Sequence, residues 1–446
     1  MASAPPKRVL SVSDGVAIVV GIVIGMGIFR APSLVAGAAG SEGWALGLWA
    51  LGGVVSLLGA LTYAELASAY PNKGGEYAIL SRAYGKPLAF LFGWARLTVI
   101  QPGTIAAAGF VLGDYLTPLL PLGPNSNAVY AALGVGLVTF VNLRGLSLSA
   151  AAQTILATLL GVCLVALTVA GFAAPAAPVA VAGPAPDLGA IGFAMVFVLL
   201  TYGGWNEAAY LSGEVANPQR DMTRILFLGV GAVTILYVAA NAAFLHVLGA
   251  ATAAKSDIVG AAAADAALGP WAALVVTAFV VTASLSTMNG TLFTGARSGY
   301  ALGRDVGALG VLARWDEKRA SPGAAVAVQA GVALALVLLG AVTKQGFETM
   351  AAYTAPVSWG FFLLTGLAAI VLRVREPETV RPFRMPLFPL PALLFAAAAL
   401  WMLWSSLTYA GSQAFNLGVQ IGVGVLMLGV VLLIVDAATG RRMGRG

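Results

Sequence analysis

The stretch GIVIGMGIFRAP, residues 21–32, decides the fold of this chain. Gly21, Gly25 and Gly27 lie in a run that is otherwise apolar enough to cross a membrane. Each glycine inside a helix costs about 0.5–1 kcal/mol relative to alanine. Three glycines within two turns indicate either close helix packing through the pair Gly21 and Gly25, or a helix that is interrupted in mid-membrane.

The composition places this stretch in a lipid bilayer. Hydrophobic residues make up 59% of the 446 residues and charged residues only 9%, whereas soluble domains carry about 25% charged residues. The single cysteine, Cys163, excludes an intramolecular disulfide. We therefore expect an all-α integral membrane protein.

Hydropathy and helix-breaking residues predict twelve transmembrane helices, since a span needs about 20 apolar residues. The predicted segments are 14–39, 43–70, 87–116, 126–143, 147–173, 187–213, 222–249, 268–300, 322–342, 347–373, 387–409 and 414–437. No soluble domain fits between them, so residues 1–446 are expected to form a single membrane domain.

The basic residues predict the orientation of these segments. With the N-terminus inside, most Lys and Arg residues fall in loops on the inner side, as the positive-inside bias requires. We therefore expect a multi-pass protein of the cell (inner) membrane with both termini in the cytoplasm. The net charge of +6 is then a topology signal, and a nucleic-acid partner is not expected.

The sixth segment contains a second candidate break, TYGGWNE at residues 201–207. Five segments precede it, so the first and sixth segments correspond in a 5+5 inverted repeat, with 14–173 as one half and 187–373 as the other. The last two helices, within 387–437, lie outside the repeat. Paired breaks expose N–H groups that suit a carboxylate and carbonyls that suit an ammonium group, so a zwitterion fits both.

At these residues the chain resembles the amino-acid permeases of the APC superfamily over nearly its whole length. The likeness is carried by GIVIGMGIFRAPS (21–33), TYAELASAYPNKGGEYAIL (62–80) and TYGGWNEAAYLSGEVANPQRD (201–221). It is nearest to bacterial permeases related to the L-amino-acid transporter branch. The resemblance implies a LeuT-like core with broken helices 1 and 6.

The resemblance also implies the substrate-binding residues. The α-carboxylate would be bound by backbone N–H groups of Gly25, Met26 and Gly27. The α-amine would be bound by carbonyls near Ile22 and Val23 in the first segment, and near Leu200, Thr201 and Gly203 in the sixth. Tyr202 and Trp205 would shape or gate the side-chain pocket, although a packed aromatic is the alternative for Trp205. Met26 is bulkier than the residue usual in relatives and would narrow the pocket.

Glu207 is the candidate coupling or gating residue, because an ionisable group within a span is costly and marks a functional site by default. Some exchangers of the superfamily carry a gating glutamate at a similar place. The alternative is a structural glutamate that is bonded to a neighbouring helix. The fifth segment, AAQTILATLLGVCLV (151–165), lacks the lysine found in many relatives, so any proton coupling would fall to Glu207.

The expected function is secondary active transport of neutral amino acids by alternating access, as an exchanger or a proton symporter. Polyamines, other amines or cationic amino acids remain the alternative substrates, and sodium coupling through Ser284, Ser286 and Thr287 remains an alternative mechanism. A channel would need a continuous polar path, and an enzyme would need clustered His, Asp or Glu. No cofactor, metal or ATP-binding loop is expected.

Overall fold

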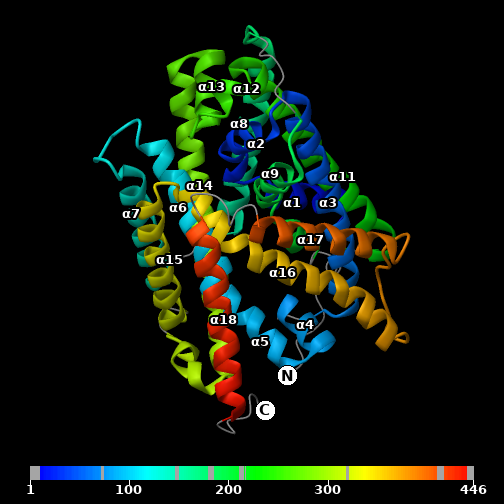
Figure 1. The fold of residues 1–446 in the computed structure, drawn as a ribbon. Helices are drawn as coiled ribbons and strands as arrows, with labels where there is room; N and C mark the ends of the chain where they lie inside the picture. The colour runs from blue at the N-terminus through cyan, green and yellow to red at the C-terminus, as the bar shows by residue number, and fades with distance from the viewer. Residues whose placement is uncertain are drawn as a thin grey trace.

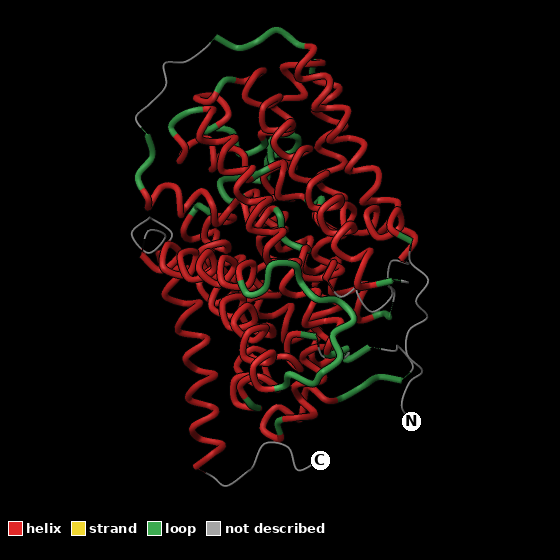
Figure 2. Tube along the Cα trace, turned by 90° about the vertical axis from the view of Figure 1, so that its right-hand side faces the viewer, coloured by secondary structure: helices red, strands yellow, loops and turns green. Residues whose placement is uncertain are grey.

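The described part of the chain is helical almost throughout. The computed structural model describes residues 11–71, 75–145, 150–178, 185–209, 215, 217–317, 321–408 and 416–438. Figure 2 shows these helices with loops at their ends and one long loop on the face turned to the viewer, which joins α16 to α17. The predicted all-α membrane protein is confirmed for the described residues.

The helices follow one another along the chain from the N-terminus to the C-terminus. They are α1 (Val12–Val23), the short 3-10 helix η1 (Met26–Phe29), α2 (Ala31–Ala39), α3 (Glu42–Ala69), α4 (Glu76–Tyr84), α5 (Lys86–Ala95), the π-helical turn η2 (Arg96–Ile100), α6 (Gln101–Leu116), α7 (Ser126–Leu143), α8 (Ala150–Ala173), α9 (Leu188–Thr201), α10 (Trp205–Ala209), α11 (Pro218–Leu248), α12 (Ala250–Ala253), α13 (Val259–Leu268), α14 (Pro270–Asp305), η4 (Gly307–Ala313), α15 (Gly323–Thr343), α16 (Gly346–Arg375), α17 (Leu390–Thr408) and α18 (Asn416–Ala438).

Ten helical spans among the described residues are long and apolar enough to cross a membrane, with α5, η2 and α6 forming one of them. The two other predicted segments, 14–39 and 187–213, are each divided into shorter helices. The total of twelve crossings therefore stays a prediction. The orientation does too, since residues 1–10 and 439–446, with the basic residues of both termini, lie outside the described residues.

Local sequence explains where the divided segments begin. Ser11 caps α1 by accepting from the Asp14 N–H, and the Asp14 carboxylate accepts from the Ser11 N–H in return. Asp187 caps α9 by accepting from the Ala190 N–H at 2.7 Å. Such caps satisfy N–H groups that a helix start would otherwise leave unpaired. Both divided segments therefore start as ordinary helices, and their interruptions arise further along the chain.

The divided segments lie inside the bundle. Figure 1 shows α1, α2 and α9 among the longer helices, with α3 and α11 alongside. Contacts of α1 with α11 and of α2 with α9 agree with this view. One continuous hydrophobic core includes Val19, Ile28, Phe29 and Phe197 from these segments. The two breaks are therefore positioned at the centre of the protein.

Candidate functional site

The first break follows Val23, where α1 ends. Ile24 and Gly25 are extended, with φ/ψ of −72°/107° and −129°/−170°, and the chain turns again only in η1. Among the described residues, the N–H groups of Met26 and Gly27 have no hydrogen-bond acceptor. A side chain added at Gly25 would meet no atom within 4 Å. The break thus leaves free backbone donors next to open space.

The second break is the turn Tyr202, Gly203 and Gly204 between α9 and α10. Gly204 has φ +106°, a conformation that side chains rarely adopt, so glycine is required there. A Cβ at Gly204 would lie 2.9 Å from the Ile22 carbonyl oxygen, and one at Gly27 would lie 3.2 Å from Thr201 Cα. The two breaks therefore touch backbone to backbone, and their segments run in opposite directions.

Tyr237 of α11 bridges the two breaks. Its hydroxyl donates to the Val23 carbonyl at 3.0 Å and lies 3.4 Å from the Thr201 carbonyl. The side chain is fully buried against the rings of Trp49 and Tyr202. Sequence reasoning missed Tyr237, although a single tyrosine within the apolar run LFLGVGAVTILYVAANAAF (226–244) was a usable signal.

The structure brings most of the predicted binding residues together. Ile22, Val23 and Gly27 of the first break face Thr201 and Gly204 of the second. Of the other predicted residues, Gly25, Met26 and Gly203 lie in the same two breaks, and Leu200 lies in the last turn of α9 beside the second. Ile22 and Leu200 are each 40% exposed, so solvent-accessible surface reaches the breaks. Their roles in binding substrate stay predictions.

Tyr202 and Trp205 point away from this meeting point. The Tyr202 hydroxyl donates to the Trp49 carbonyl at 2.9 Å. Trp205 is 2% exposed and packs edge-on against Tyr63 and Phe395, with ring centroids 5.1 and 5.4 Å away. Both rings therefore support the second break from behind, against α3 and α17, and a pocket-shaping role for them stays a prediction.

Glu207 lies beyond the second break, toward the start of α1. Its side chain is 57% exposed, and its nearest cationic partner is Arg96 Nη2 at 4.0 Å. Arg96 Nη1 also lies 4.0 Å from Glu76 Oε2, and the Tyr63 hydroxyl donates to Glu76 Oε1 at 2.6 Å. We call these residues, with Gln101, the Arg96 cluster. Gln101, oriented with its amide oxygen toward Arg96, accepts from Nε at 3.2 Å and from Nη2 at 3.1 Å.

Local geometry and burial set the properties of the Arg96 cluster. Arg96 opens the π-helical turn η2, just before Pro102 in α6, and such turns are frequent at functional sites. Glu76, on α4 outside the spans, is buried, and burial raises its pKa above the ordinary glutamate value even though Arg96 and Tyr63 oppose the change. Glu76 was also missed from the sequence.

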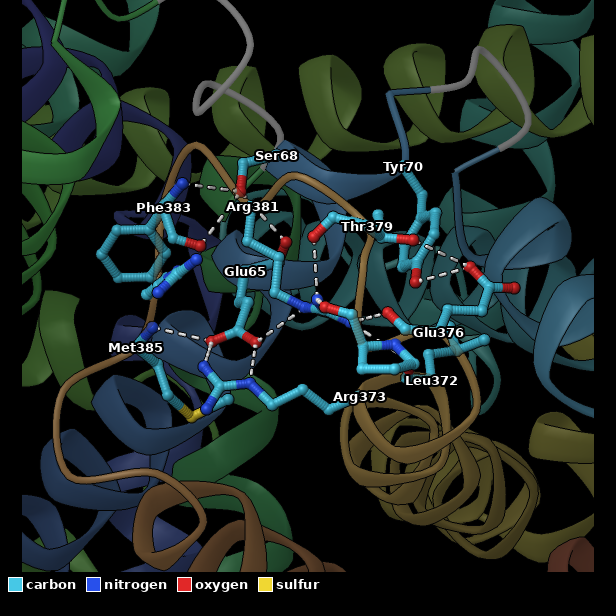
Figure 3. A network of polar contacts seen from close by, with 12 residues as sticks. Glu65, Ser68, Tyr70, Leu372, Arg373, Glu376, Thr379, Arg381, Phe383 and Met385 are labelled. Atoms are coloured by element: carbon cyan, nitrogen blue, oxygen red, sulfur yellow. Dashed lines mark hydrogen bonds and ion pairs between the residues drawn. The ribbon is translucent and has the colours of Figure 1, made fainter.

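Glu65 near the end of α3 forms a second buried polar group, the Glu65 network (Figure 3). Arg373 of α16 donates to both carboxylate oxygens of Glu65 at 2.9 Å, and Arg381 Nε lies 3.7 Å away. The Met385 N–H donates to Glu65 at 2.7 Å. The network therefore ties residues 376–389, the loop between α16 and α17, to α3.

Known proteins resemble this chain over most of its length. A family model described as amino acid permease matches residues 10–433. The human b(0,+)-type amino acid transporter 1 is 30% identical over 398 residues, which cover 87% of this chain and 80% of that protein. The rat counterpart is 29% identical over 392 residues, covering 86% and 79%. The human large neutral amino acids transporter small subunit 2 is 30% identical over 443 residues, covering 95% and 81%.

Proposed function

The chain belongs to the amino acid permease family, and on that premise we propose that it carries neutral amino acids across the cell membrane by alternating access around its two helix breaks. It works as an exchanger or as a proton symporter. The observation that carries this proposal is the meeting of two uncapped backbone segments, with free N–H groups on one and carbonyls on both, at the centre of the bundle.

The substrate carboxylate is assigned to the first break. The N–H groups of Met26 and Gly27 have no acceptor among the described residues, and Gly25 borders open space. Backbone N–H groups at a helix start bind anions through their hydrogen bonds and the local dipole. A carboxylate in this space would complete the hydrogen bonding of the break, which a bilayer otherwise makes costly.

The substrate ammonium group is assigned to the carbonyls at the ends of α1 and α9. Those of Val23 and Thr201 face the single hydroxyl of Tyr237, while the carbonyls near Ile22, Leu200 and Gly203 lie in the same breaks. A carbonyl oxygen has two lone pairs, so an ammonium group can bind Val23 and Thr201 beside Tyr237 or in place of it.

Neutral substrates are favoured by the chemistry of the open space. Residues 21–28 and 198–204 contain the two breaks and the helix ends beside them. They include no charged side chain. A second charge on the substrate would therefore lack a partner there, and a buried unpaired charge is costly. One relative is a large neutral amino acids transporter small subunit, which agrees with this assignment.

Glu207 is assigned a gating role on the side of the breaks where α1 begins. Its weak, half-exposed pair with Arg96 joins α10 to η2 at 4.0 Å. Exposed pairs of this kind contribute about 0–1 kcal/mol, so it can break and form again without a large cost. Alternating access also follows from treating residues 14–173 and 187–373 as two inverted repeats, which the antiparallel breaks support.

Uptake into proteoliposomes tests the proposal. Labelled neutral amino acids are offered with and without the same amino acid trapped inside, and with and without an inward proton gradient. Uptake that needs trapped substrate and ignores the gradient makes the protein an exchanger. Accumulation driven by the gradient and lost in Glu207→Gln makes it a proton symporter. If no amino acid enters, with sodium also supplied, the proposal is wrong and amines become the next substrates to try.

A matched pair of glycine variants ties the uptake to the breaks. Gly27→Ala forces a Cβ to within 3.0 Å of Thr201 Oγ1 and should reduce uptake strongly, because the breaks must separate. Gly47→Ala in α3, where an added Cβ meets nothing within 4 Å, should leave uptake unchanged. Equal uptake in the two variants would contradict a substrate site at this meeting point.

A further inference from the structure

Arg30, directly after η1, is the centre of a buried group that the proposed site does not use. Its Nη2 lies 2.6 Å from Glu348 of α16 and 2.9 Å from Asp257, and its Nε lies 3.6 Å from Asp114 of α6. We call these four residues the Arg30 cluster. Arg30 is 4% exposed. The cluster joins four stretches of the chain on the side of the breaks opposite Glu207.

This side of the breaks is closed by packing as well as by charge. Ile28 and Phe29 are fully buried. The Tyr115 hydroxyl donates to the Phe29 carbonyl at 2.7 Å and accepts from the Gly260 N–H at 3.2 Å. By contrast, Ile22 and the side chain of Glu207, on the other side of the breaks, are 40% and 57% exposed. The structure therefore represents a state that is closed at the Arg30 cluster.

The charges within the Arg30 cluster do not balance. One guanidinium faces three carboxylates, and the other groups at hand are neutral: Ser33 accepts from Arg30 Nη1, Asn127 of α7 donates to Asp114, and Phe347 lies 5.6 Å from the guanidinium carbon. Tyr115 adds a hydroxyl that is already bonded on both sides. A buried carboxylate without a full counter-charge is costly unless it gains a proton.

The geometry distinguishes the three carboxylates. The Asp257 side chain is 72% exposed, so water can stabilise its charge. Glu348 is buried but lies at 2.6 Å from Arg30 Nη2, which is hydrogen-bonding distance. Asp114 is 12% exposed, and its contact with Arg30 is too long for a hydrogen bond. The buried Arg30 Nε has no hydrogen-bond partner among the residues that the structure describes. Asp114 is thus the carboxylate with the weakest compensation.

We propose that Asp114 is a proton-binding site and that a proton on it accompanies closure of the Arg30 side of the transporter. The inference rests on the proposed transport function. When this side is open, water surrounds Asp114 and the carboxylate is ionised. When it closes, Asp114 enters a cluster with excess negative charge and takes up one proton. Because the closed state binds more protons than the open state, acid favours closure and alkali favours opening.

Accessibility of a single cysteine tests this proposal without an amino acid. Cys163 is the only cysteine, so Cys163→Ser with Gly25→Cys places one thiol in the open space of the first break. The predicted orientation, with the N-terminus inside, places the Arg30 side toward the outside of the cell. A membrane-impermeant thiol reagent is therefore added outside intact cells at several pH values. Each labelling rate is divided by that of the same reporter with Asp114→Asn, so that the titration of the thiol itself cancels.

With Asp114 intact, we expect this ratio to rise with pH, by up to about tenfold per pH unit for one proton. Asp114→Glu should retain the rise, because it keeps a titratable group. Asp257→Asn, on the exposed carboxylate of the same guanidinium, should also retain it. A constant ratio, or a rise abolished by Asp257→Asn, would overturn the proposal. Each variant is first checked for a monodisperse elution profile.

The labelling result and the uptake result fail independently. Labelling that depends on pH through Asp114, in a protein that takes up no amino acid, would support the proton site and reject the proposed function. Uptake of neutral amino acids, together with labelling that does not depend on Asp114, would support the proposed function and reject the proton site.

Discussion

The Glu65 network and the Arg30 cluster both join α3 or the first break to α16 through buried arginine–carboxylate contacts, but their charge balance is opposite. One carboxylate faces two arginines in the Glu65 network, and its oxygens accept three hydrogen bonds, one of them from a backbone N–H. One arginine faces three carboxylates in the Arg30 cluster, and its Nε has no hydrogen-bond partner in the described part of the chain.

The difference separates a fixed connection from a switch. Arginine stays charged in proteins, so the two arginines of the Glu65 network cannot reduce its excess positive charge by losing a proton. Carboxylates can gain protons, so the Arg30 cluster has two charge states that favour different arrangements. The Arg96 cluster, with one arginine and two carboxylates, lies between these extremes.

The largest effect is expected at the Glu65 network. Glu65→Gln leaves Arg373 and Arg381 without their carboxylate, and removing one partner of a buried pair costs about 3–5 kcal/mol. The apparent Tm in detergent should fall sharply, and acid should not restore it. Glu378→Gln, at an exposed carboxylate in the loop that this network holds, should leave the Tm unchanged. Similar Tm values for the two variants would show that the network is not a fixed connection.

The next effect is expected at the Arg30 cluster. Arg30→Met removes the cation of the Arg30 cluster, and at neutral pH the closed state should lose less than the roughly 3–5 kcal/mol of a fully buried pair, because the Asp257 side chain is exposed. External labelling of Gly25→Cys should therefore be faster than that of the same reporter with Arg30 intact, and the ratio of the two rates should fall in acid as the carboxylates are protonated. A ratio that acid does not lower would remove the contrast with the Glu65 network.

A smaller, pH-dependent effect is expected at Glu76 in the Arg96 cluster. Because burial raises the pKa of Glu76 in the folded protein, the folded state binds this proton more tightly than the unfolded state. Its contribution to stability is therefore present at low pH and is lost as pH rises from the ordinary glutamate value through the folded one. Glu76→Gln should flatten the Tm profile above about pH 4. A Tm profile that is unchanged by the substitution would contradict this predicted loss of stability with rising pH.

The smallest effect is expected at a group without charge. Tyr237→Phe removes the hydroxyl that bridges the two breaks, and a single neutral hydrogen bond contributes about 0.5–1.5 kcal/mol. Stability should change little and independently of pH, measured by the same Tm assay. A loss as large as that of Glu65→Gln would mean that the bridge, and not the ion pairs, secures the centre of the protein.

Much of the fold could be predicted because its signals are local. Apolar runs and glycines indicate spans and interruptions directly, and the interruptions at Gly25 and Gly203–Gly204 lie where those glycines occur. Arg30 and Glu348, however, are separated by 318 positions in the chain. Their pairing depends on the tertiary packing that brings the residue after η1 to the first turn of α16, which no local pattern encodes. For the same reason the sequence left two alternatives for Trp205, a pocket residue or a packed aromatic, and only the structure shows its packing against Tyr63 and Phe395.

The Tyr237 bridge has a consequence for net flux. Its hydroxyl donates to the Val23 carbonyl and lies at longer range, 3.4 Å, from the Thr201 carbonyl. An empty carrier with its carbonyls satisfied has a smaller penalty for reorienting across the membrane than one with bare carbonyls. In the proposed transport cycle, the same hydroxyl would therefore help to set how readily the unloaded protein reorients. Its removal would slow that step and favour one-for-one exchange over net accumulation.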